Sequence, residues 1–298
     1  MYQPGWADPA TLDELAHVGV AAGYDALWLH DHLVTPAELS QLGPLAFLDP
    51  LIVAAHLASI HPDVSIGFAT LVLPLREPVV LSKQLATLAT FFPGRIIAGI
   101  GAGRYESEFE RFGSDDYPRR GALMREHLAL MQSLFADGPT TFEGTRRSVR
   151  DADMYPKPTH EELAIWLAAQ APKAIARAGR DAAGWITAGV TLEDFSVLAE
   201  HYRAGLEEAG RTWADRSIAL SVTVDLRTPD ERADEDLHRH AYALTGSADD
   251  VASALRGYTD AGVTDVLLAF STNSLDDLAK QIRWFSQEVR PRIESLPT

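Results

Sequence analysis

Short apolar runs alternate along this chain with longer segments whose apolar residues recur at helical spacing. The apolar runs predict strands over 25–33, 64–73, 95–103, 163–170, 184–189, 217–227 and 265–271. The periodic segments predict helices over 11–22, 49–60, 79–92, 119–136, 172–180, 192–210, 249–262 and 275–289. Asp49 is the expected N-cap of the second helix, with Pro50 at its first position. Strands separated by helices throughout favour a parallel sheet with helical crossovers.

This pattern predicts an α/β protein, with residues 1–298 forming one domain with a TIM-type (β/α)8 barrel. A closed barrel needs eight strands, but only seven strand–helix units follow from Ala26 onward. The opening residues, "MYQPGW", are few and polar, so the first barrel strand is expected to be short or missing. The segment around 137–162 has the least regular pattern and is predicted to be an irregular excursion or lid.

Composition narrows the class of function. The net charge of -16 repels phosphate backbones and anionic lipid surfaces, so neither nucleic acid nor a membrane is an expected partner. The sequence has no apolar run of about 18 residues and no signal-peptide pattern at its N-terminus. The absence of cysteine excludes a disulfide framework, a thiolate nucleophile and a zinc–thiolate site. A cytoplasmic protein is therefore expected.

A glycine cluster ends the strand predicted at 95–103. A dinucleotide-binding turn requires the spacing G-x-G-x-x-G, but the position of the third glycine after Gly99 and Gly101 is Arg104. Alternating glycines instead remove side chains from one face of the strand. Two interpretations remain open, because the bare face could accept a flat ligand or another part of the protein.

Two histidines flank an aspartate in "LWLHDHL". His30 and His32 would share one face of a strand, with Asp31 on the other. Paired imidazoles could bind a metal, but the later strand ends "AAQA", "WITAG" and "LAFS" offer no further ligands, so no metal is predicted. The histidines could also be hydrogen-bonded core residues. An Asp–His pair at a strand end is well suited to proton transfer.

The order of motifs resembles the bacterial luciferase-like monooxygenase family. The segments "AAGYDALWLHDHL", "IGFATLVLPLREPVVLSKQLATLATFFPGRIIAGIGAGRYESEFERFG" and "AIWLAAQAPKAIARAGRDAAGWI" carry the resemblance. It implies a barrel that binds FMN or the deazaflavin coenzyme F420 in the mouth formed by the strand ends. In such proteins the pair that matches Ala69–Thr70 often carries a non-prolyl cis peptide bond behind the ring.

The resemblance also implies the site residues. His32 would handle the proton, and Asp31 would orient it or contact the cofactor. The segment "AAQAPKAIARAG" matches the turn on the cofactor's phosphate side, where Pro172 would be the first helical residue. The implied cofactor-binding residues are Asp31, Ala69, Thr70, Ala102, Gly103, Arg104, Gln170, Ala171, Lys173 and Ala174.

Two departures bear on the substrate. In the deazaflavin-dependent sugar-phosphate dehydrogenases, a glutamate stands at the position of Arg104 and an aromatic residue at the position of Pro36. Because this chain has neither, oxidation of glucose 6-phosphate is disfavoured. Arg104 could hold a carboxylate, an enolate or a cofactor phosphate, or it could pair with Glu106 or Glu108 on the surface. Arg76 and Arg95 are interpreted as structural.

The leading hypothesis is an oxidoreductase that acts on a small organic substrate. With FMN it would use oxygen as a monooxygenase, and with F420 it would transfer a hydride without activating oxygen. The alternatives are a non-catalytic flavin-binding barrel and, less favoured, a metal-dependent hydrolase. A homodimer is possible, with Phe91 and Phe92 either at its interface or under a buried helix end.

Overall fold

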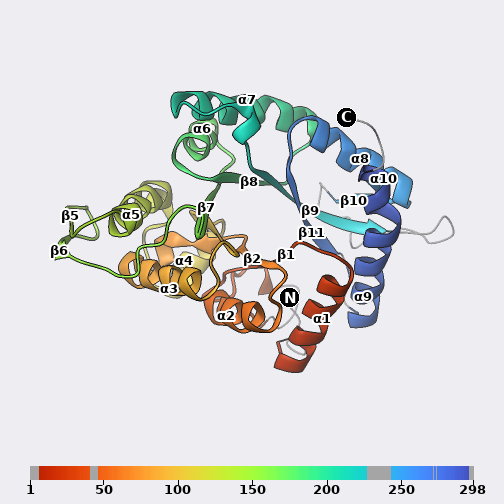
Figure 1. Cartoon of the computed structure of the whole chain (residues 1–298), viewed down its shortest axis with the longest axis horizontal. Coiled ribbons are helices and arrows are strands. Elements are labelled where there is room, and N and C mark those ends of the chain that lie inside the picture. The colour runs from red at the N-terminus through yellow and green to blue at the C-terminus, as the bar shows by residue number, and fades with distance from the viewer. Residues whose placement is uncertain (1–6, 41–45, 227–242, 271, 273, 295–298) are drawn as a thin grey trace. The chain divides into compact units, whose positions relative to one another are not determined.

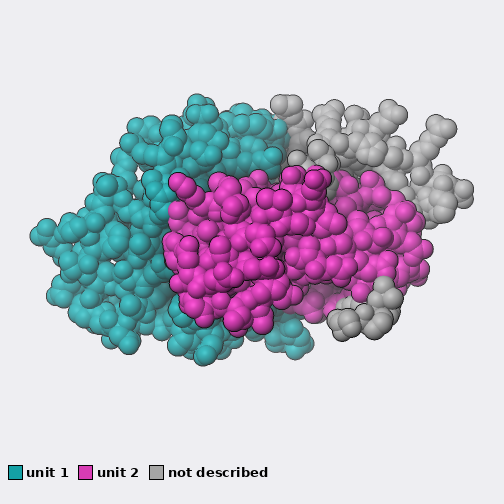
Figure 2. Space-filling model, turned by 90° about the horizontal axis from the view of Figure 1, so that it is seen from above, with its two compact units in different colours: residues 1–13, 26–168 teal, residues 14–25, 169–298 magenta. Residues whose placement is uncertain are grey.

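The computed structural model describes residues 7–40, 46–226, 243–270, 272 and 274–294 (Figure 1). The chain divides into two compact units, one of residues 1–13 and 26–168 and the other of residues 14–25 and 169–298, coloured separately in Figure 2. The expected position of a first barrel strand, within residues 1–6, lies outside the described residues. That the whole chain forms one domain stays a prediction.

Unit 1 is built on a parallel sheet. Strand β1 (Ala26–Leu29) pairs with β2 (Ser65–Phe68), which pairs in turn with β4 (Ile96–Gly101). Strand β4 also pairs with β7 (Leu163–Ala168) and with the short β3 (Leu71–Val72). Because all these pairings are parallel, the carboxyl ends of the strands and the residues that follow them lie at one edge.

The helices of unit 1 follow the strands in alternation. The elements are α2 (Pro50–Ile60), the 3-10 turn η3 (Leu73–Leu75), α3 (Pro78–Phe91), α4 (Glu106–Phe112), the 3-10 turn η4 (Tyr117–Arg119) and α5 (Arg120–Phe135). Asp49 caps α2 as expected, accepting hydrogen bonds from the backbone N–H groups of Leu51 at 3.0 Å and Ile52 at 3.3 Å. Helix α1 (Pro9–Ala21) begins in unit 1 and continues in unit 2.

The segment 137–162 is more ordered than its sequence suggests. It contains an antiparallel pair of strands, β5 (Thr140–Phe142) and β6 (Val149–Ala152), separate from the parallel sheet. The predicted irregular excursion from the sheet is confirmed, and the structure adds to it this short hairpin, whose register shifts between Thr140 and Phe142. These strands are only three and four residues long, too short for an alternation of apolar and polar residues to mark them.

Unit 2 repeats the parallel arrangement around a long central strand. Strand β9 (Ile218–Leu226) pairs with β8 (Gly184–Ala188), β10 (Leu244–Gly246) and β11 (Asp265–Phe270). The remaining elements are α6 (Pro172–Asp181), α7 (Leu192–Glu208), the 3-10 turn η5 (Trp213–Asp215), α8 (Ala248–Asp260), α9 (Leu275–Trp284), the π-helical turn η7 (Phe285–Val289) and α10 (Arg290–Glu294).

The seven predicted strands are present as β1, β2 with β3, β4, β7, β8, β9 and β11. The structural interpretation of Arg95 is also confirmed, because its guanidinium donates to the carbonyls of Ala58, His61 and Val64. Trp185 is fully buried in unit 2 and its indole stacks with the rings of Phe195 and Tyr202.

Candidate functional site

The residues His30, Asp31 and His32 follow directly after β1, at the carboxyl edge of the unit 1 sheet. Burial lowers the pKa of His30 to about 4, and its hydrogen bond with the backbone of Ala69 offsets only part of this effect. His30 is therefore neutral near pH 7 and lies beside one of the predicted cofactor-binding residues.

Asp31 is the centre of a buried ion pair. Its side chain is 1% exposed, and its carboxylate accepts hydrogen bonds from Arg76 Nε at 2.8 Å, Arg76 Nη2 at 2.7 Å and the Val72 backbone N–H at 2.9 Å. Arg76 Nη2 also donates to Asp49 Oδ2 at 2.9 Å. Burial opposes the charge on Arg76, but hydrogen bonds with Asp31 and Asp49 raise its pKa above the ordinary value. This geometry fixes the loop after β1 to η3 and to the start of α2.

His32 forms a dyad with Glu108. Its Nδ1 lies 3.2 Å from both carboxylate oxygens of Glu108, whose side chain is 1% exposed, while the imidazole is 15% exposed. In the tautomer that donates Nδ1–H to the Glu108 carboxylate, Nε2 is left as the ring's hydrogen-bond acceptor. The ring of Phe47 meets the imidazole edge-on at 4.5 Å between centroids, and that of Tyr105 lies at 6.0 Å. His32 is thus oriented by a buried carboxyl group and flanked by aromatic rings.

The carboxylate bonded to His32 is that of Glu108, buried at the third position of α4, whereas Asp31 accepts hydrogen bonds from Arg76 and Val72. A surface pairing of Glu108 with Arg104 was one of the alternatives that the sequence left open, and the burial of Glu108 contradicts it. Arg104 is exposed, and its guanidinium lies over the Tyr105 ring at 5.6 Å. A glutamate within a seven-residue helix gives no periodic signal that would have revealed its burial.

The peptide bond between Ala69 and Thr70 is cis, as the resemblance implied. Thr70 also explains one of the alternating glycines, because a Cβ on Gly101 would lie 2.2 Å from Thr70 Oγ1. Gly103 has a φ of 86°, and a Cβ there would meet Phe109 and Val72 at 2.7 and 2.9 Å. At Gly101 and Gly103, therefore, packing within the protein accounts for the glycines. Ala102, between them, is partly exposed.

Unit 2 carries the segment that resembles the phosphate-side turn. Pro172 is the first residue of α6, as expected, and the N-cap Ala171 provides no side-chain hydrogen bond. In contrast, α7, α8 and α9 are capped by Thr191, Ser247 and Ser274 and have acidic residues in their first turns. The start of α6, with exposed Lys173 and no acid, is therefore the helix N-terminus in the described part of this unit best suited to an anion.

Two other residues of this turn have visible roles. The Ala174 backbone N–H donates to the Ala171 carbonyl at 2.8 Å, tightening the first turn of α6. Gln170 Nε2 donates to the Ala188 carbonyl at 2.7 Å, which ties the turn to the end of β8.

Within the described ranges, no cluster of three or more histidine and acidic side chains could hold a metal ion.

Comparison with known proteins places the chain in a family. The model of the luciferase-like monooxygenases matches residues 2–267. The chain belongs to the luciferase-like monooxygenase family. Among curated members, the F420-dependent glucose-6-phosphate dehydrogenase of Kineococcus radiotolerans is 28% identical over 95% of this chain and 93% of that protein. The described helices of this family member include none long and apolar enough to cross a membrane.

Solved structures show the fold. The chain superposes on an F420-dependent secondary alcohol dehydrogenase with a TM-score of 0.81 at 19% identity, covering 96% of this chain and 95% of that one. It also matches the oxygenating constituent of 3,6-diketocamphane monooxygenase from Pseudomonas putida, with FMN, at a TM-score of 0.75 and 18% identity, over 99% and 96% of the two chains. The expected family, its TIM-type barrel fold and its oxidoreductase class are confirmed.

Proposed function

We propose that this protein is an F420-dependent oxidoreductase that interconverts a hydroxyl and a carbonyl group on a small organic substrate. The His32–Glu108 dyad carries the proposal, because a histidine oriented by a buried carboxylate is suited to moving a proton at Nε2. The choice of F420 over FMN is supported by the Kineococcus dehydrogenase, whose similarity extends over nearly the full length of both chains.

The residues present fit such a cofactor. The uncapped start of α6, with Lys173, has the chemistry that suits a phosphate group. The backbone around Ala69, Thr70, Ala102 and Gly103 would lie against its ring. F420, when bound, accepts or supplies a hydride, and every other requirement of the reaction falls to the protein.

In the proposed reaction the protein accepts the proton of the substrate hydroxyl and, in the reverse direction, returns it. In the direction of oxidation, His32 Nε2 takes the O–H proton while the carbon-bound hydrogen leaves as a hydride, so a carbonyl forms and the imidazole becomes a cation. Glu108 stabilises that cation through Nδ1–H and keeps the ring in place. In the reverse direction the imidazolium returns the proton to the oxygen.

The substrate is proposed to differ from glucose 6-phosphate. Where the sugar-phosphate dehydrogenases have a glutamate and an aromatic residue, this chain has Arg104 and Pro36. The exposed guanidinium of Arg104, over the Tyr105 ring, would instead suit a substrate that carries a carboxylate. Hydroxy acids and their keto forms are therefore the first compounds to screen.

The proposal is tested by single-turnover absorbance measurements on F420 with a panel of hydroxy and keto acids. We expect His32→Gln to slow the chemical step by about 10²–10⁴-fold while F420 affinity is preserved, since the imidazole acts on the proton. Glu108→Gln should also slow turnover, because an amide at this position can stabilise the wrong tautomer.

His56→Gln is the matched control. His56 also pairs with a carboxylate, Asp13, at 2.7 Å, but both side chains are about 40% exposed on the surface of unit 1. This variant should turn over at the wild-type rate. Wild-type turnover in His32→Gln with the same substrate would contradict the proposed proton transfer.

A further inference from the structure

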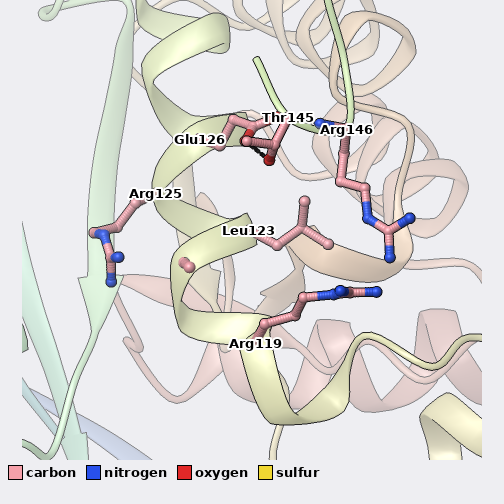
Figure 3. Close-up of a pocket in the computed structure, with 7 residues that line it drawn as sticks. Arg119, Leu123, Arg125, Glu126, Thr145 and Arg146 are labelled. Carbon is pink, nitrogen blue, oxygen red and sulfur yellow. Dashed lines mark hydrogen bonds between the residues drawn. The ribbon is translucent and has the colours of Figure 1, made fainter.

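An open cleft lies in unit 1 between α5 and the loop that connects β5 to β6. Its volume is about 500 Å³. Figure 3 shows its lining, which includes Arg119, Leu123, Arg125, Glu126, Thr145 and Arg146. None of these residues belongs to the dyad or to the predicted cofactor-binding set.

Glu126 fixes the loop to α5. Its carboxylate accepts hydrogen bonds from the Thr145 hydroxyl and from the backbone N–H groups of Arg146 at 2.8 Å and Arg147 at 3.3 Å. Burial alone would raise the pKa of Glu126, but these hydrogen bonds lower it to about 2. The backbone of Arg146 is thus held in place. The Arg147 side chain instead donates from Nε to Glu77 Oε1 at 2.7 Å.

Two guanidinium groups converge beside this loop. Arg119 Nε donates to Asp116 Oδ1 at 2.6 Å, and Arg146 Nη2 donates to the same oxygen at 2.5 Å. Asp115 lies farther away, at 3.4 Å from Arg119 and 3.5 Å from Arg146. In Figure 3 both arginines lie on the side of α5 that carries Leu123, whereas Arg125 points to the other side.

Both arginines keep donors for a ligand. Within the described part of the chain, Arg119 bonds through Nε and Nη2 and the Arg146 guanidinium through Nη2, which leaves Nη1 of each and Nε of Arg146. Their side chains are 54% and 43% exposed, so both arginines can be reached from solvent. Both guanidinium groups already donate to Asp116 Oδ1, so the two side chains can reach a single anionic oxygen.

We propose that this cleft binds a small anion with a carboxylate or phosphate group, held between Arg119 and Arg146. Asp115, Asp116 and Glu126 balance the charge of the three arginines. Glu126 is occupied by the loop, so Asp116 is the carboxylate that competes with the ligand for the two guanidinium groups.

The test is calorimetric titration of the full-length protein with inorganic phosphate, without cofactor. Arg119→Gln and Arg146→Gln should each weaken phosphate binding about tenfold or more, because each removes a charge-assisted hydrogen bond. Asp116→Asn should strengthen binding, because the competing charge is lost. Arg150→Gln, on the same hairpin but 83% exposed and paired with Glu143, should bind as the wild type does. Circular dichroism confirms that each variant is folded.

Three results would overturn the proposal. The first is no phosphate binding by the wild-type protein at millimolar concentration. The second is equal weakening in Arg150→Gln and Arg146→Gln, which would reflect diffuse surface charge. The third is that Arg146→Gln lowers the affinity for F420 and leaves that for phosphate unchanged, which would assign the cleft to the cofactor site. These outcomes are independent of whether the His32 variants turn over substrate.

Discussion

Removing the Asp31 carboxylate should destabilise unit 1 strongly. Asp31→Ala leaves Arg76, whose side chain is 9% exposed, without its bidentate partner and the Val72 N–H without its acceptor. Breaking a buried ion pair by removing one partner costs about 3–5 kcal/mol. Asp49 still neutralises part of the Arg76 charge at 2.9 Å, so we expect a loss near the lower end, about 3 kcal/mol.

Two companion variants separate the contributions. Asp31→Asn keeps an acceptor for Val72 N–H but loses the charge, and should cost about 1–3 kcal/mol. Asp49→Ala removes the N-cap of α2 and a partly exposed partner of Arg76, and should cost about 1 kcal/mol. The expected order of destabilisation is therefore Asp31→Ala, then Asp31→Asn, then Asp49→Ala.

The assay is urea unfolding followed by tryptophan fluorescence, with the midpoint shift at constant slope giving the change in the free energy of unfolding. Trp28 and Trp166, whose rings lie 5.9 Å apart in unit 1, report on the affected region. F420 affinity is measured on the same samples. If Asp31→Ala loses less than about 1 kcal/mol and yet abolishes F420 binding, the ion pair is not structural and Asp31 acts on the cofactor directly.

Two further predictions concern the packing of β4 and the cleft loop. Gly101→Ala should lower the free energy of unfolding in urea by about 1–3 kcal/mol, because the added Cβ would lie 2.2 Å from Thr70 Oγ1. Adding Thr70→Ala should recover much of that loss. No recovery in the double variant would contradict the contact. Glu126 has a pKa lowered to about 2 from 4.5, so the stability it gives the loop is present above pH 4.5 and is lost as the pH falls toward 2. Hydrogen exchange of residues 145–147, corrected for its intrinsic pH dependence, should show protection declining over that range; constant protection would contradict the role of Glu126.

The sequence was sufficient for the order of elements because strands and helices here have strong, different periodicities. It located the N-cap at Asp49, the first residue of α6 at Pro172 and the structural role of Arg76. It missed β5 and β6, which are too short to carry a recognisable alternation. Local patterns therefore predict long, half-buried elements well and short exposed ones poorly.

The candidate site was only partly predictable, because its key contacts join residues far apart in the sequence. His32 and Glu108 are 76 positions apart, and Asp31 and Arg76 are 45 apart. The residue types at 31 and 32 suggested proton chemistry, but nothing in the sequence indicated that the carboxylate bonded to His32 is Glu108. The cofactor-binding roles of the ten residues named from the resemblance stay predictions.

The most direct test of the proposed function is a fluorescence titration of the purified protein with F420 and, separately, with FMN. We predict micromolar binding of F420, weak or no binding of FMN, and no oxygen consumption when substrates are added to the F420-bound protein. Tight binding of reduced FMN, with oxygen consumed when a substrate is added, would contradict F420-dependent hydride transfer and establish a flavin monooxygenase instead.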